Sequence, residues 1–462
     1  MSTSPISLRS VRGAFALPGR LLTAVEALFG AAAVGLLGIT TVLVQWAVSS
    51  NAWVFFFLAT KPLIDLTWRW KVFQFSEQEV NPQTIVGLVV LGLNGIVILK
   101  RAAWRRLPRR VLLFLACATL SVVFSPSSWG FNELLRLLAG TTFFYTAGPL
   151  LAEARQFDRF RKVFLWAMAV PVLLTFFQVA GFLPYEYWDW TELGQIGRAS
   201  GTYPTPLTLS FFLFYAFPLA LSIADSKQQT QSARRWASLF LILASVALAF
   251  GNHRTSYFII ALQILTWLFM TRGRKAVLVF LVILAVVVIL SFSWLQMLYA
   301  PLTQALTGNI DITSGEFLRG RGFQWFLFLN SYASSGPFHW VMGNGGSIIA
   351  GYDPHDPLVD SVEPHNDYIR ILHAYGMVGL LLYLSVLALL LRKTFQLLRS
   401  PDEFARTVAR VMLLALTAVI IQSVMMEPTR YPTGVWYLFA LGSVLFCLGK
   451  NASPSQTRNL QP

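Results

Sequence analysis

The chain has 462 residues, of which 55% are hydrophobic and 12% are charged. A soluble domain normally carries about 25% charged residues, so this composition argues against a chain that faces water on all sides. The formal net charge of +15 comes from basic residues in short clusters between apolar runs. Such clusters are typical of membrane topology, and without a basic stripe on a polar domain they argue against binding to nucleic acid.

Long apolar runs recur along the chain. A helix needs about 20 mainly apolar residues to cross a hydrocarbon core about 30 Å thick. Runs near that length predict an all-α, polytopic membrane helix bundle with about twelve transmembrane helices. The predicted spans are 22–48, 83–100, 110–126, 133–151, 160–183, 204–224, 235–251, 255–271, 275–296, 368–391, 405–426 and 433–449.

A further apolar stretch, 51–66, is interrupted by Lys61, Pro62 and Asp65. Arginines near the N-terminus favour a cytoplasmic start of the chain, because basic residues flanking a span tend to stay inside. That orientation requires an even number of crossings before the basic loop at 100–110. We therefore expect 51–66 to be interfacial or re-entrant rather than spanning.

Basic residues between the spans predict the orientation of the bundle. The loop at 100–110 is dense in lysine and arginine, so we place it in the cytoplasm. If successive spans alternate in direction from that loop, every later loop assigned to the cytoplasm is basic. The loops assigned to the opposite, periplasmic face are poor in basic residues. These basic-poor loops are 126–132, 184–203, 251–255, 297–367 and 426–432.

The long loop between the last two groups of spans is rich in aromatic residues such as Trp325 and Trp340. Aromatic content argues against disorder, so we expect a small folded lobe with short helices on the membrane surface. The polar end of the chain is expected to be a disordered cytoplasmic tail. The resulting division is 1–296 for N-terminal transmembrane helices, 297–367 for the large periplasmic loop, 368–450 for C-terminal transmembrane helices and 451–462 for the tail.

Two arginines lie at helix boundaries on the face where basic residues are scarce. Arg198 lies just before the span 204–224, and Arg254 lies in the short turn before 255–271. One interpretation is snorkelling to lipid headgroups or pairing with a loop carboxylate. The other is anion binding, because the donor fork of a guanidinium matches phosphate oxygens. Two such groups on adjacent helix ends would hold a diphosphate without a metal.

Arg319 and Arg321 are the only basic residues that we assign to the body of the large loop, which is otherwise acidic. Ion pairing within the loop is the simpler interpretation of both. The alternative is a second contact to an anion or to a sugar.

The sequence at the end of the large loop places His365 directly after a proline and before a predicted span. A histidine there can take a proton from a sugar hydroxyl, because its pKa lies near neutrality. Asn366 would cap the following helix or orient the imidazole. Gly376 and Gly379 are expected to share a helix face and to allow close packing of a neighbour. A loop histidine is more often structural than catalytic, so the residues alone leave both roles open.

Motifs that bind metals or nucleotides are absent from the sequence. It has no H-E-x-x-H, Walker-type, paired-cysteine or G-x-S-x-G motif, and no acidic pair of the kind that holds a metal–nucleotide sugar. We therefore expect neither a metal nor another cofactor. This pattern fits a lipid-linked donor that is used outside the cytoplasm.

The spacing around His365 resembles a known family signature. His365-Asn366, nine residues, Gly376, two residues, Gly379, two residues and a leucine is similar to the H-[NSQ]-x9-G-x-x-G-x-x-L pattern of the O-antigen ligase and polymerase superfamily, the Wzy-C family. Arg198, in an Arg-x-x-Gly-Thr-Tyr context, resembles that family's arginine in an earlier periplasmic loop. Arg254 resembles its second arginine, and the likeness is strongest over about 190–385.

The resemblance implies an enzyme of the bacterial inner membrane with its active site facing the periplasm. Such proteins transfer a glycan from undecaprenyl diphosphate to a sugar hydroxyl, and direct displacement would invert the anomeric centre. The acceptor is lipid A–core for a ligase or a second lipid-linked repeat unit for a polymerase, and the sequence leaves this choice open. By resemblance, Arg198 and Arg254 hold the diphosphate, His365 is the general base, and Arg319 or Arg321 contacts glycan or phosphate.

A transporter or flippase for lipid-linked oligosaccharide is the alternative from a different class. It would need polar or ionisable residues deep within several spans. In this chain the residues in mid-span are nearly all apolar, and the charges gather at helix ends. This pattern favours an enzyme at the membrane surface.

Overall fold

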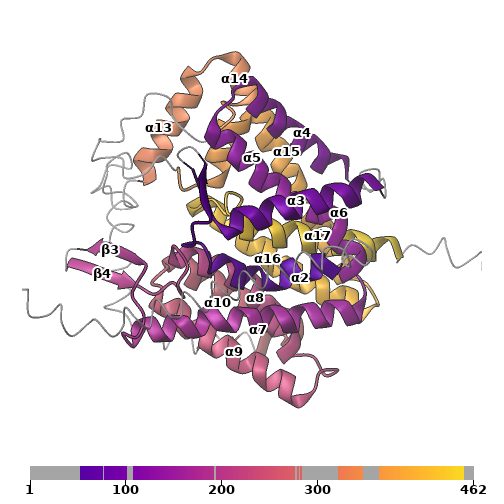
Figure 1. The fold of residues 1–462 in the computed structure, drawn as a ribbon. Coiled ribbons are helices and arrows are strands. Elements are labelled where there is room, and N and C mark those ends of the chain that lie inside the picture. Colours follow the sequence, from indigo (N-terminus) through magenta and orange to yellow (C-terminus); the bar gives the residue numbers. More distant parts are fainter. Residues whose placement is uncertain are drawn as a thin grey trace, which may run out of the picture.

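A computed structural model of the chain describes residues 52–75, 78–100, 108–191, 194–275, 278–279, 281–282, 321–346 and 364–451. In these residues the fold is a bundle of helices with two short antiparallel hairpins, β1–β2 and β3–β4 (Figure 1). The predicted spans 22–48 and most of 275–296, the residue Arg319 and the tail after 451 lie outside the described residues.

The described elements follow the predicted spans closely, because each long apolar run forms one helix or a helix pair. The two hairpins are the departure from the all-α prediction. In chain order the elements are α2 (Ala52–Asp65), β1 (Phe73–Phe75), β2 (Gln78–Val80), α3 (Pro82–Lys100), α4 (Arg109–Phe124), α5 (Ser128–Thr141), α6 (Phe143–Leu151), α7 (Ala154–Val179), β3 (Tyr187–Thr191), β4 (Gly194–Arg198), α8 (Pro206–Ala224), α9 (Gln231–Phe250), α10 (Arg254–Arg272), α13 (Arg321–Ser334), α14 (Pro337–Met342), α15 (Asp367–Leu398), α16 (Glu403–Met425) and α17 (Pro432–Asn451).

Eight helical segments in the described part are long and apolar enough to cross a membrane. They confirm a polytopic membrane helix bundle. α4, at the predicted span 110–126, is helical but has 16 residues, fewer than the roughly 20 that a full crossing requires. The total of about twelve spans therefore stays a prediction.

The segment 51–66 forms α2, which lies among the other helices and packs against α7. Lys61 and Asp65 form an ion pair in the interior, and Thr433 of α17 donates a hydrogen bond to Asp65 at 3.0 Å. Pairing allows two charges to be buried together. At about 1.5 Å per residue the 14 residues of α2 span roughly 21 Å, less than a hydrocarbon core. The helix is therefore part of the bundle interior and not a helix on its surface.

α8 and α17 occupy the centre of the bundle, and nearly all side chains of α8 are buried. α17 packs most extensively on α6. A Cβ on Gly148 of α6 would lie 2.2 Å from the Ser443 hydroxyl oxygen of α17, so glycine is what lets these two backbones approach. The outer helices leave leucine, isoleucine and phenylalanine side chains exposed, as expected of surfaces that face lipid.

Four connections meet at one end of the bundle because successive helices alternate in direction. They are the segment before α8, the α9–α10 turn, the segment before α15 and the α16–α17 loop. Figure 1 shows hairpin β3–β4 and α13 at this end, on the left of the view. The described part of the predicted large loop forms α13 and α14, which pack against α15.

Candidate active site at one end of the helix bundle

His365 lies in the turn that begins α15. Its φ is +48°, in the left-handed region that few residues other than glycine adopt. Asn366 caps α15, because its side-chain oxygen accepts a hydrogen bond from the Ile369 amide at 3.0 Å. The Trp325 indole of α13 donates to the carbonyl of Pro364 at 2.7 Å. The turn that carries His365 is thus fixed by both α15 and α13, and the predicted capping role of Asn366 is confirmed.

Arg198 is the last residue of β4, and its guanidinium lies 5.9 Å from the centre of the Tyr187 ring in β3. The amide of Ala199 donates to the carbonyl of Phe250 at 3.3 Å, which joins this segment to the end of α9. Arg254 is the first residue of α10, and its side chain lies outside the described part. The segments that carry the two predicted diphosphate-binding arginines are therefore neighbours in space.

His253 lies immediately before α10 and is buried at this junction. Its Nδ1 lies 2.6 Å from the Ser256 hydroxyl. Burial, followed by the positive charges of Arg321 and Arg198, lowers the pKa of His253 from 6.5 to about 3. His253 is therefore neutral near pH 7 and lies close to both arginines. The sequence gives it no distinguishing context except its place beside Arg254.

His365 is also held neutral by its surroundings. Burial, followed by the positive charges of Arg321 and Arg430, lowers its pKa from 6.5 to about 4. Arg321 begins α13, and its charge acts on both His253 and His365, so α13 begins near both histidines. Sequence reasoning placed Arg321 near the site but missed Arg430.

Arg430 lies in the loop between α16 and α17 and forms an ion pair with the buried Glu427 at 3.2 Å. The loop belongs to the face that the sequence predicts to be poor in basic residues. An arginine in such a loop is the pattern that singled out Arg198 and Arg254, and applied here it would have identified Arg430 as well.

A buried polar network fixes the loop of Arg430 to the start of α15. The Asp367 carboxylate accepts hydrogen bonds from the amide of Thr429 at 2.8 Å and from its hydroxyl at 2.6 Å. Arg370 pairs with Asp367 at 3.0 Å and with Glu133 of α5 at 3.2 Å. Loss of one partner would leave a buried charge uncompensated, so the network holds the geometry of the site in place.

Gly376 corrects one prediction from the sequence. Its φ of +70° interrupts α15, so it does not share a regular helix face with Gly379. Gly379 does lie in the following helical part, where a Cβ would meet Tyr375 at 2.4 Å and Cys117 of α4 at 3.7 Å. The spacing of two glycines predicts proximity along a helix, but it carries no information on the sign of φ.

The segment Gly343–Gly346, here called the glycine loop, fits into this break. The amide of Asn344 donates to the carbonyl of His373, and the amide of Gly345 donates to the carbonyl of Ala374, both at 2.9 Å. These bonds satisfy carbonyls that the helix break leaves without their usual partners. A Cβ on Gly343 would lie 2.3 Å from the Ala374 oxygen, so the fit requires glycine.

The His373 side chain contributes to the same contact. Its Nδ1 lies 3.1 Å from the carbonyl oxygen of Gly346, and its Nε2 lies 3.2 Å from the side-chain amide of Asn344. Nδ1 must therefore carry the proton, and Nε2 accepts one. His373 thus fastens the glycine loop, and with it α13 and α14, to α15.

Backbone strain is concentrated at this end of the bundle. Among the described residues, the non-glycine residues with positive φ are Thr202, Asn252 and His365. They lie in the segment after Arg198, in the α9–α10 turn and in the turn before α15. Strained backbone of this kind is often found at functional sites, where the surrounding structure imposes it.

Taken together, the positive charges of Arg198, Arg321 and Arg430 act on two neutral imidazoles, those of His253 and His365. Such a site suits an anionic group that lies beside a proton acceptor. The part of the chain that the structure describes contains no cluster of three or more His, Cys, Asp or Glu arranged to hold a metal ion.

The fold and this site define a multi-pass membrane protein with a basic, histidine-containing site at one end of its helices. Residues 239–384 match the family described as O-antigen ligase, so this part of the chain is an O-antigen ligase family domain. The match confirms the resemblance noted from the sequence. It covers His253, Arg321 and His365, whereas Arg198 and Arg430 lie outside it. A comparison with curated proteins gives no match.

Proposed function

We propose that the protein transfers a glycan from undecaprenyl diphosphate to a sugar hydroxyl at the periplasmic face of the bacterial inner membrane. The O-antigen ligase family domain supports a membrane enzyme of the ligase or polymerase type.

The donor diphosphate is assigned to Arg198, Arg254 and Arg321. When the bond between the anomeric carbon and the phosphate oxygen breaks, negative charge develops on the leaving diphosphate. Guanidinium groups at this position would stabilise that charge in the transition state. The arginines supply the positive charge in this scheme, and no metal takes part.

His365 is assigned as the general base. Its neutral imidazole takes the proton of the acceptor hydroxyl as the acceptor oxygen forms a bond to the anomeric carbon. The leaving diphosphate departs on the opposite side, so the anomeric configuration is inverted. The proton is left on the imidazole and returns to solvent.

The observation that carries this proposal is the place of His365, which lies within the O-antigen ligase family domain in a turn that Asn366 and Trp325 hold at the start of α15. Its surroundings also lower the pKa of His365. Arg321 and Arg430 contribute to the shift through their positive charges. An anionic diphosphate bound beside them would neutralise part of this charge, and the pKa of His365 would rise towards its ordinary value. His365 would therefore become a stronger base when the donor is in place, which couples proton removal to the presence of the donor.

The experiment that tests the function is reconstitution in liposomes with an undecaprenyl-diphosphate oligosaccharide. Longer lipid-linked chains identify a polymerase that uses a second repeat unit as acceptor. Glycan on added lipid A–core identifies a ligase. If neither product forms and intact donor instead moves between the leaflets, the transfer proposal is wrong and a flippase is supported.

A further inference from the structure

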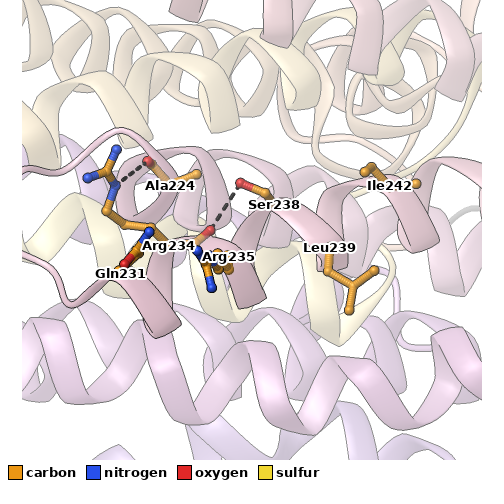
Figure 2. Close-up of a pocket in the computed structure, with 7 residues that line it drawn as sticks. All are labelled: Ala224, Gln231, Arg234, Arg235, Ser238, Leu239 and Ile242. Carbon is orange, nitrogen blue, oxygen red and sulfur yellow. Dashed lines mark hydrogen bonds between the residues drawn. The ribbon is translucent and has the colours of Figure 1, made fainter.

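α8, α9 and α10 form a groove at the end of the bundle opposite His365. A hollow of about 710 Å³ lies along the first turns of α9 and is lined by Arg234, Arg235, Ser238 and apolar residues (Figure 2). A second hollow of about 370 Å³ shares Ser238 with the first and continues to Arg272 of α10. Pockets for small ligands commonly measure about 300–1,000 Å³, so the groove is large enough for a headgroup and part of a chain.

The mouth of the groove is positively charged. Arg234 and Arg235 are both exposed, and the side chain of Arg235 makes no hydrogen bond or ion pair with any residue that the structure describes. Arg234 donates to the carbonyl of Ala224 through Nε at 3.3 Å, which leaves its terminal nitrogens available (Figure 2). Arg272 of the second hollow is already paired with Asp225 at 2.5 Å.

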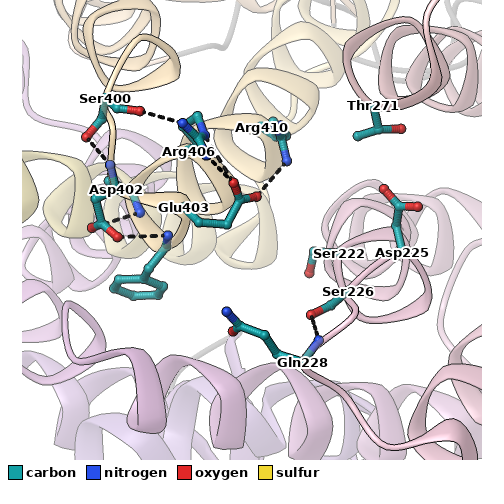
Figure 3. A network of polar contacts seen from close by, with 12 residues as sticks. Ser222, Asp225, Ser226, Gln228, Thr271, Ser400, Asp402, Glu403, Arg406 and Arg410 are labelled. Carbon is teal, nitrogen blue, oxygen red and sulfur yellow. Dashed lines mark hydrogen bonds and ion pairs between the residues drawn. The ribbon is translucent and has the colours of Figure 1, made fainter.

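Two arginines at the start of α16, at the same end of the bundle, share an acidic partner. Arg410 pairs with Glu403 at 3.2 Å, and Arg406 pairs with the same carboxylate (Figure 3). Their charge is therefore compensated within the protein. At the groove the charge of Arg234 and Arg235 has no such carboxylate among the described residues, which favours an external anion.

The wall below the arginines is apolar. Leu239 is 47% exposed and Ile242 is 61% exposed, and Val246 continues the same face of α9. Beside the mouth, Trp236 stacks on Trp166 of α7 with ring centres 4.2 Å apart. Tryptophan is enriched where a membrane meets water, so the arginines lie at headgroup level and the apolar wall lies at acyl-chain level.

We propose that this groove binds an anionic phospholipid. Its phosphate lies at Arg234 and Arg235, and one acyl chain follows Leu239 and Ile242 along α9. A soluble phosphate would use the arginines but not the apolar wall, and a neutral lipid would use the wall but not the charge. The sequence predicts that this end faces the cytoplasm, where the inner leaflet attracts basic segments through its anionic lipids. The site is separate from that of the proposed glycan transfer.

The test is native mass spectrometry of the full-length purified protein with added cardiolipin, and with phosphatidylcholine as the neutral probe. The double variant Arg234→Gln/Arg235→Gln should weaken cardiolipin binding about 30-fold, since each arginine near a membrane surface contributes roughly 1 kcal/mol. The matched control is Arg109→Gln/Arg110→Gln at the start of α4, which removes the same charge at two exposed positions. It should bind cardiolipin like the unmodified protein.

A second variant separates a groove from simple charge attraction. Ser238→Trp fills the space shared by the two hollows and keeps both arginines. It should also reduce cardiolipin retention at least tenfold, while glycerol phosphate should not compete in the unmodified protein. Unchanged cardiolipin binding in both the double variant and Ser238→Trp, or equal binding of phosphatidylcholine, would overturn the proposal.

Discussion

The positive charge of Arg321, at the start of α13, acts on the imidazole of His365, at the start of α15, and lowers its pKa. The glycine loop that follows α14 is bonded to the interrupted part of α15, and the Trp325 indole reaches the carbonyl of Pro364. The segment that begins with α13 is therefore attached to the chain both before His365, at Pro364, and after it, within α15.

The first prediction concerns pH. The neutral form of His365 is the active one, so transfer should fall as pH drops through its pKa. For kcat/KM, which reports free enzyme, the fall should centre at about 4. For kcat it should lie at higher pH, because the bound diphosphate offsets the arginine charges. Initial rates measured in liposomes across the acid range will show the pH at which kcat/KM falls and the pH at which kcat falls.

Arg430→Gln tests the cause of that shift. Removal of one positive charge near His365 should move the acid limb of kcat/KM upward, towards 6.5. Arg392→Gln, at an exposed position of α15, is the control and should leave the limb in place. If kcat/KM falls at the same pH in the Arg430 variant as in the unmodified protein, the charge of Arg430 does not set the pKa of His365.

The second prediction concerns the arginines assigned to the diphosphate. Arg198→Ala and Arg254→Ala should each lower kcat/KM by about 10²–10³-fold, since each removes a donor to the leaving group. Arg198→Lys should recover only part of the rate, because an ammonium cannot make a two-point contact. The measurement is kcat/KM with purified donor. An unchanged kcat/KM in either alanine variant would show that this arginine does not act on the diphosphate.

The third prediction concerns the buried network at the start of α15. Arg370→Leu should lower stability by about 3–5 kcal/mol, because Asp367 and Glu133 lose their shared cation in the interior. Arg406→Leu removes the corresponding partner of Glu403 in an exposed pair and should cost no more than about 1 kcal/mol. Thermal unfolding in detergent compares the two, and equal losses would contradict the importance of burial.

The fourth prediction concerns the glycine loop. Gly343→Ala would bring a Cβ to 2.3 Å from the Ala374 oxygen and should displace α13 and α14 from α15, with loss of transfer. Gly336→Ala has a similar positive φ but no atom within 4 Å of the added Cβ, so it carries only the backbone cost. Equal activity of the two variants would show that the fit into α15 is unimportant.

Hydropathy and basic loops were sufficient to predict most described helices, because membrane spans leave a long apolar run in the sequence. They also placed Arg198 and Arg254 on neighbouring connections. They predicted that 51–66 is interfacial or re-entrant, and they could not show that it packs among the other helices, because the pairing of Lys61 with Asp65 inside the bundle depends on tertiary packing. The hairpin β3–β4 was also missed, since its strands are short and lie within a loop.

The site was predictable where its residues stand out locally and not where they meet through folding. His365 and Asn366 form a recognisable motif. The basic-poor loop of Arg430 could have singled it out from the sequence, but the action of its charge on His365 follows only from folding. His253 gains its significance only when the α9–α10 turn comes near Arg198 and Arg321. The break at Gly376 was hidden because its glycine spacing is equally compatible with a continuous helix.

The most direct test of the proposed chemistry is His365→Asn, compared with the unmodified protein in the same liposome assay. Asparagine tolerates the left-handed backbone of this position but cannot act as a base near neutral pH. In this variant glycan transfer should fall by at least about 100-fold, while binding of the undecaprenyl-diphosphate donor should stay nearly unchanged. Transfer at the unmodified rate by a well-folded variant would contradict the role of His365 as general base.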